Sequence, residues 1–155
     1  YIDTVDPASH QVGPMQTLLE NLYKQETTFG ATDFSALCGH LGKHVNKRSF
    51  LVLYTNFSNM TSLNRQLVYL QQLARQHRVL VVFFEDADLK EYIAGKSVTT
   101  EDYYRHVIAE KFAFEKRLIV STLKQHGIYS LLTTPDKLSI DVINKYLEMK
   151  SRQLL

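Results

Sequence analysis

The sequence is poor in the residues that build disulfides, thiol-rich metal centres and nucleotide-binding loops. It has one cysteine, no tryptophan, six glycines and three prolines in 155 residues. A single cysteine excludes an intramolecular disulfide and every Cys-rich metal spacing, and it favours a reducing, cytoplasmic setting. The glycines are never spaced as G-x-G-x-x-G, and no phosphate loop or Ser/His/Asp motif is present. These absences argue against a dinucleotide-binding enzyme or a serine hydrolase.

The charge balance and the apolar runs exclude two further classes. With 18 basic and 16 acidic residues the net charge is +2, too even for the one-sided basic footprint of a nucleic-acid-binding protein. The longest apolar run, Val79 to Phe84, is far below the roughly 18 residues of a membrane span. We therefore expect no membrane contact by this fragment. Because the chain begins at Tyr1, we expect a piece of a longer protein, whose upstream segments can include a membrane anchor.

Three short apolar runs predict the strands of a buried sheet. They lie near residues 50–55, 79–84 and 128–132. Continuous apolar runs of this length are typical of parallel strands covered on both faces. A short edge strand at Tyr1–Val5 is a weaker prediction.

Helical patterns precede and separate these runs. Pro14 opens a first helix, and Thr32 is a suitable N-cap for a second. Thr99 and Asp102 have capping-box spacing, and Gly127 is placed to end the helix that they begin. Apolar residues recur at helical spacing in each later helix: Phe34, Leu37, Cys38 and Leu41; Leu63, Leu67, Leu70 and Ala74; Ile108, Phe112, Ile119 and Leu123; and Ile140, Ile143 and Leu147.

The alternation of strands and helices predicts the fold class. From Phe50 onward the order is strand, helix, strand, helix, strand, helix, which implies right-handed crossovers and a parallel sheet. We expect one α/β domain over residues 1–155 with three layers, the sheet being flanked by helices. This arrangement is Rossmann-like.

Polar side chains follow each predicted strand and form a candidate site. In open α/β sheets, ligands bind beyond the carboxyl ends of the strands. Short oxygen-bearing side chains suit Mg²⁺, but turns and helix caps need the same residues. Both interpretations stay open for the set, which comprises Thr55, Asn56, Ser58, Asn59, Glu85, Asp86, Asp88, Thr133, Thr134 and Asp136.

Two other features could carry chemistry, and each has a simpler structural interpretation. His40 and His44 are four residues apart on a predicted helix and could face one metal ion. No third ligand is evident, so a solvated helix face explains them better. Cys38 lies on the apolar face of its helix, where a buried thiol behaves as a small hydrophobic residue.

Several segments, in order, resemble the bacterial DUF58 family. The segment from Asn46 to Phe57, NKRSFLVLYTNF, is similar to that family's kRSLvvLfTDf strand. The segment from Arg75 to Val82, RQHRVLVV, is similar to its "rrH.vlvv" strand. The stretch 109–117 resembles the helix that follows that strand. The segment from Val142 to Arg152 is similar to the terminal "vn.YLelKar" signature, and Asp33-Phe34 matches the "DF" of an upstream helix.

The resemblance implies a C-terminal portion of a von Willebrand factor A-like domain whose first strands precede Tyr1. Such domains bind a divalent ion through D-x-S-x-S, a later Thr and an Asp. The D-x-S-x-S motif is not in this sequence, the Asp position is Asn56, and Thr32 is the nearest match to the Thr. Because Asn lacks the negative charge, we expect a degenerate site and no resident cofactor.

Two functions follow as hypotheses. The first is a non-catalytic protein-interaction module, which the resemblance links to complex assembly with MoxR-type AAA+ ATPases, using the strand exits as its contact surface. The alternative is a metal-dependent or small-ligand Rossmann-like enzyme that uses Glu85, Asp86 or Asp88. If the first strands are missing, the strand near 50–55 has an unpaired edge, and we expect self-association through it.

Overall fold

The computed structural model describes residues 16, 19–20, 23–24, 32–85 and 99–154. The described elements are α2 (Phe34–His44), β1 (Phe50–Tyr54), α3 (Met60–Gln76), β2 (Arg78–Phe84), α5 (Thr100–Gln125), β3 (Tyr129–Thr133) and α6 (Leu138–Ser151). Each of the three main predicted strands is confirmed to within one residue at either end. The expected strand Tyr1–Val5 lies outside the described residues, as does most of the helix expected after Pro14.

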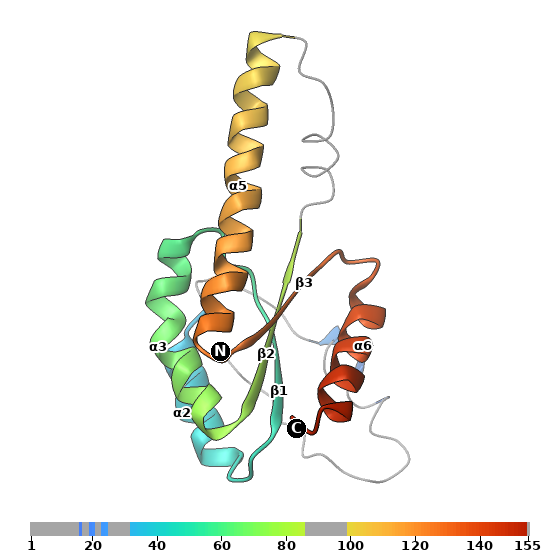
Figure 1. Ribbon diagram of the computed structural model, residues 1–155. Coiled ribbons are helices and arrows are strands. Elements are labelled where there is room, and N and C mark those ends of the chain that lie inside the picture. The colour runs from blue at the N-terminus through green and yellow to red at the C-terminus, as the bar shows by residue number, and fades with distance from the viewer. Residues whose placement is uncertain (1–15, 17–18, 21–22, 25–31, 86–98, 155) are drawn as a thin grey trace.

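The three strands form one parallel sheet in the order β1-β2-β3. The chain steps across this sheet in one direction, and a right-handed crossover then places each connecting helix on the same face. Helices α3 and α5 accordingly share one face, where α2 joins them, and α6 covers the other (Figure 1). The predicted three-layer α/β architecture is therefore confirmed.

Strand β2 is the centre of the molecule. Its residues from Val79 to Phe83 are almost completely buried, because β2 has a strand on each side and helices on both faces. Side chains alternate between the two faces of a strand. Val79, Val81 and Phe83 belong to the main core with α2, α3 and α5, which is completed by Phe34, Cys38, Phe57, Leu63, Leu70, Leu73, Ile119, Leu123 and Ile128.

The opposite face of the sheet has a thinner cover. Leu80 and Val82 are fully buried there, and Met149 is the buried residue of α6. The Phe50 ring of β1 contacts Tyr146 of α6, with 5.8 Å between ring centroids. Further along β1, Tyr54 is 59% exposed. The expectation that β1 is buried on both faces is thus wrong at its end, because the single helix α6 is too narrow to cover three strands.

Helix α5 is longer than the sheet is deep. Its 26 residues span about 39 Å at 1.5 Å per residue. The three strands, with 5, 7 and 5 residues, span only about 17–23 Å. The N-terminal half of α5 therefore extends past the sheet (Figure 1). Ile119 and Leu123 are fully buried, but Ile108 and Phe112, on the same face of the helix, are about half exposed. The sheet does not reach as far along α5 as Ile108 and Phe112.

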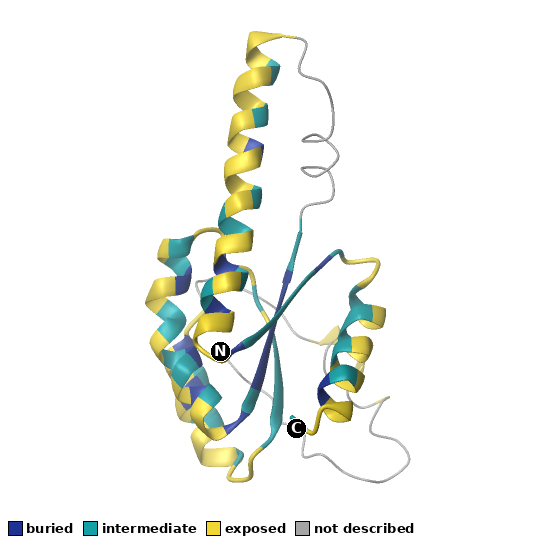
Figure 2. Ribbon diagram, viewed as in Figure 1, coloured by how far each residue is buried: buried dark blue, intermediate teal, exposed yellow. Residues whose placement is uncertain are grey.

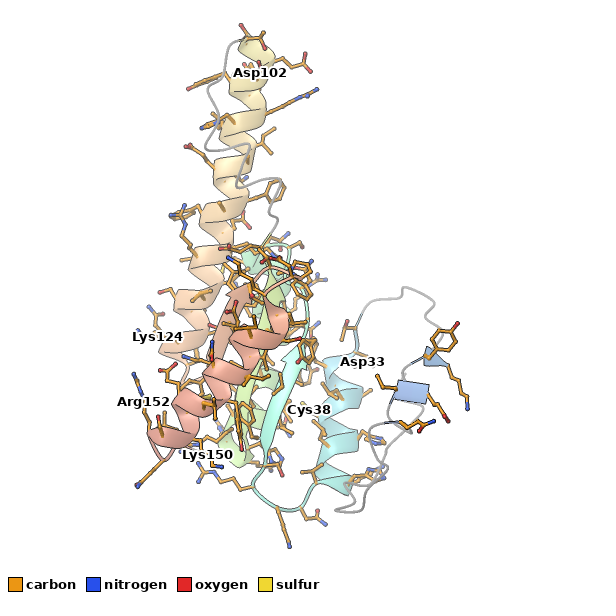
Figure 3. All side chains as sticks on the ribbon, turned by 90° about the vertical axis from the view of Figure 1, so that its right-hand side faces the viewer. Asp33, Cys38, Asp102, Lys124, Lys150 and Arg152 are labelled. Atoms are coloured by element: carbon orange, nitrogen blue, oxygen red, sulfur yellow. The ribbon has the colours of Figure 1, made fainter. Side chains whose placement is uncertain are left out.

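The helix ends show one correction and two confirmations. The N-cap of α2 is Asp33 and not Thr32, since Asp33 Oδ1 accepts a hydrogen bond from the Ala36 amide at 2.9 Å (Figure 3). The predicted capping box of α5 is confirmed by reciprocal bonds of 3.1 Å between Thr99 and Asp102. Gly127 follows α5 with φ of 71°, the left-handed conformation that glycine adopts without strain.

Candidate functional site

The carboxyl ends of the strands meet at one edge of the sheet, as the parallel topology requires. The start of α2 lies at this edge as well, because the Phe34 ring stacks on Phe57, just beyond β1, at 6.1 Å between centroids. Thr32 lies two residues before Phe34, and Asn56 directly precedes Phe57. The stacking of the two rings therefore brings Thr32 and Asn56 to the same end of the molecule.

Asn56 is held by a lysine that the sequence analysis did not single out. The Lys116 ammonium, on α5, donates a hydrogen bond to Asn56 Oδ1 at 2.6 Å. The same Nζ lies 5.5 Å from the centroid of the Phe83 ring of β2, within the range of a cation–π contact. Partial burial against this apolar surface lowers the pKa of Lys116.

This contact places a positive charge at Asn56, the position that the DUF58 resemblance assigns to a degenerate cation site. The side-chain oxygen of Asn56 is already engaged by an ammonium, and a cation at Asn56 would be repelled by it. Among the described residues, no group of three or more His, Cys, Asp and Glu side chains could hold a metal ion. Asp86 and Asp88 lie outside the described residues.

Other residues of the candidate set serve the local structure. Asn59 is the N-cap of α3, and its Oδ1 accepts from the Ser62 amide at 2.8 Å. Thr133 is buried, and its hydroxyl donates to Asp141 in the first turn of α6 at 2.5 Å. For these two residues the turn-and-cap interpretation holds, since their oxygens already have partners within the fold.

Two of the remaining exit residues, Thr55 and Glu85, extend the sheet through their backbones. Thr55 is half-buried and its amide donates to Val82 O at 3.0 Å, which extends the β1–β2 pairing by one residue. Ser58 is exposed. The Glu85 amide donates to Thr133 O at 2.9 Å, so the Glu85 backbone continues the β2–β3 pairing. None of these contacts brings two carboxylates together.

The histidine pair and the cysteine have structural roles. The rings of His40 and His44 are stacked, with centroids 4.2 Å apart and planes 17° from parallel. Ring nitrogens in nearly parallel planes point alongside one another and do not converge on one ion. Cys38 lies on α2 beside the sheet (Figure 3), and its Sγ is 3.6 Å from Tyr69 O. Burial raises the pKa of the Cys38 thiol, which disfavours the reactive thiolate.

His77 is a buried polar residue at the opposite end of the sheet. It is 3% exposed, and its Nδ1 accepts a hydrogen bond from the Ser49 amide at 3.3 Å. The bond ties the loop before β1 to the start of β2. The sequence signals this residue only through the resemblance of its segment to a DUF58 strand, where the histidine is one of the matching letters.

Within the described ranges, no helix is both long enough and apolar enough to span a bilayer. Comparison with protein-family models, with curated proteins and with solved structures gave no match.

Proposed function

We propose that this chain is a non-catalytic protein-interaction module of the DUF58 or von Willebrand factor A-like type, and that its partner is a MoxR-type AAA+ ATPase. One observation carries the proposal, namely an apolar surface on α6 that faces solvent. The resemblance to DUF58 proteins suggests the class of partner, and the apolar surface of α6 suggests where that partner binds.

The surface, termed the α6 surface, consists of Ile140, Ile143, Tyr146 and Leu147. Ile140, Ile143 and Leu147 are 64%, 57% and 53% exposed, whereas Met149 on the other side of the helix is 1% exposed. At about 100° per residue, the three exposed aliphatic side chains point away from the sheet. A helix that is apolar on two sides is typical of one that is covered on both.

The α6 surface continues onto β1. Tyr146 contacts Phe50, and β1 is hydrogen-bonded to β2 alone among the described strands. In the part of the chain that the structure describes, no strand pairs with the outer edge of β1, which lies beside an apolar surface, the combination used when a partner adds a strand to a sheet.

The strand exits support the same function by their chemistry. Asn56 is bound by Lys116, and Asn59 and Thr133 are used within the fold. These three side chains are polar and already have partners within the fold, while the α6 surface is apolar and exposed. Removal of apolar surface from water is the main driving force of association, so the α6 surface is the stronger candidate for the contact.

Calorimetric titration of the 155-residue chain with a MoxR-type ATPase from the same organism tests the proposal. We expect saturable binding that Ile143→Glu and Leu147→Glu each weaken at least tenfold. Gln72→Glu, which adds the same charge at an exposed position of α3, is the matched control and should bind as the wild type does. Absence of binding, or equal loss in the control, would show that the proposal is wrong.

A further inference from the structure

A second apolar surface lies on α5, on the opposite side of the sheet from α6. It consists of Tyr103, Tyr104, Val107, Phe114 and Leu118, termed the α5 stripe. These side chains are 40–68% exposed. At about 100° per residue they occupy a sector about 100° wide, whereas Ala109, Ile119 and Leu123 are buried on the far side of the helix. Figure 2 shows exposed residues along the whole length of α5.

The size of the α5 stripe suggests that it is covered in the functional protein. Aromatic side chains present about 150–250 Å² each, so three exposed aromatic residues and two aliphatic ones amount to about 500 Å² of apolar surface. Patches of this size on soluble proteins commonly mark interaction sites. The stripe is separate from the proposed ATPase contact, because α5 and α6 cover opposite faces of the sheet (Figure 1).

The spacing within the stripe identifies the kind of partner. Tyr104, Val107, Lys111, Phe114 and Leu118 follow one another at intervals of three, four, three and four residues. This alternation is the repeat of helices that pair with another helix as a coiled coil. Four of the five positions are apolar, and Lys111 occupies the fifth.

The charges beside the stripe identify the partner and its direction. Glu110 and Arg117 flank the stripe on one side, one heptad apart, and both are exposed. In an antiparallel pair of identical α5 helices, Glu110 of each copy lies beside Arg117 of the other. In a parallel pair, Glu110 would lie beside Glu115 of the other copy, and the two Lys111 side chains would face each other. Opposite charges at flanking positions set helix orientation, so these charges favour the antiparallel pair.

The same register matches the helix ends. When Lys111 lies opposite Phe114 of the other copy, Val107 lies opposite Leu118, and Thr100 lies opposite Gln125. Thr100 and Gln125 are the first and last residues of α5, so the two helices overlap over their full length. Each projecting N-terminal half is then covered by the C-terminal half of the other copy, and Lys111 is placed against the Phe114 ring.

We infer that the chain forms a homodimer through antiparallel pairing of the α5 stripes. Sedimentation velocity over about 1–200 µM tests it, with circular dichroism to confirm that each variant is folded. Val107→Glu and Leu118→Glu should each raise the dimer dissociation constant at least tenfold. Ile143→Glu, which adds the same charge to the α6 surface, should leave the dimer intact and impair binding of the ATPase alone.

Charge exchange tests the orientation. Glu110→Lys and Arg117→Glu should each weaken the dimer, and the double variant should restore it. A parallel pair would instead be tightened by Glu110→Lys, since the new lysine would face Glu115. Three results would overturn the inference: a monomer throughout the concentration range, a dimer unaffected by the stripe variants (as edge pairing of β1 would give), or tightening by Glu110→Lys.

Discussion

Asn56→Asp should stabilise the protein, although Asn56 is an exposed residue in a loop. The Lys116 ammonium already lies 2.6 Å from Asn56 Oδ1, so the substitution turns a charged hydrogen bond into an ion pair without moving any atom. Two unit charges at about 4 Å attract by about 4 kcal/mol at the effective dielectric near a protein surface. Most of this attraction is offset, because the existing hydrogen bond is lost and solvent screens the two charges. Measured exposed ion pairs retain about 1 kcal/mol or less.

The predicted gain depends on pH in a defined direction. Lys116 lowers the pKa of the new carboxyl group in the folded state, so its stabilisation is fully present above the unfolded-state pKa of about 3.9. It is lost as the pH falls through the lower, folded-state pKa. We therefore expect a gain of about 1 kcal/mol at neutral pH and almost none near pH 2.

Urea unfolding and thermal unfolding of four proteins measure the effect. They are the wild type, Asn56→Asp, Lys116→Met and the double variant, and the double-mutant cycle isolates the coupling between the two positions. At neutral pH the melting temperature of Asn56→Asp should rise by about 3 °C, given the usual dependence for a chain of this length. An equal gain in the Lys116→Met background, or a gain that persists at pH 2, would refute the contact on which the reasoning depends.

Three further outcomes follow from the same structure. Titration of Asn56→Asp with Mg²⁺ should show at most weak binding, because Lys116 neutralises the new carboxylate, and tight Mg²⁺ binding by the variant or by the wild type would contradict our interpretation of Asn56. Leu123→Ala should cost about 3 kcal/mol in urea unfolding, as buried leucines do, whereas Leu147→Ala should cost less than about 0.5 kcal/mol, as surface changes do. Asp33→Ala should cost about 1 kcal/mol through the lost N-cap, while Thr32→Ala should have no measurable effect; the reverse order in thermal unfolding would contradict the assigned cap.

The strands and most helices could be predicted because their signals are local. Continuous apolar runs identified all three described strands, and the spacing of Thr99 and Asp102 located the start of α5. The N-cap of α2 was predicted one residue too early, at Thr32, because Thr and Asp are both good N-caps. Which of two adjacent capping residues is used depends on where the backbone enters the helix. That geometry depends on packing, here on the contact between Phe34 and Phe57.

The contacts of the candidate site could not be predicted because they join distant parts of the chain. Asn56 and Lys116 are 60 positions apart, and no periodicity relates them. Periodicity also indicates which residues share a helix face without indicating whether that face is covered. Ile108 and Ile119 share one side of α5, yet the sheet covers Ile119 alone because the N-terminal half of the helix extends past it.

Hydrogen–deuterium exchange of the complex with a MoxR-type ATPase tests the central claim most directly, because it locates the contact without mutation. The account predicts slowed exchange in α6, at residues 138–151, and along β1, at residues 50–54, with residues 55–59 at the strand exit unchanged. Slowed exchange confined to residues 55–59 and 133–137, with α6 exchanging as in the free chain, would contradict it.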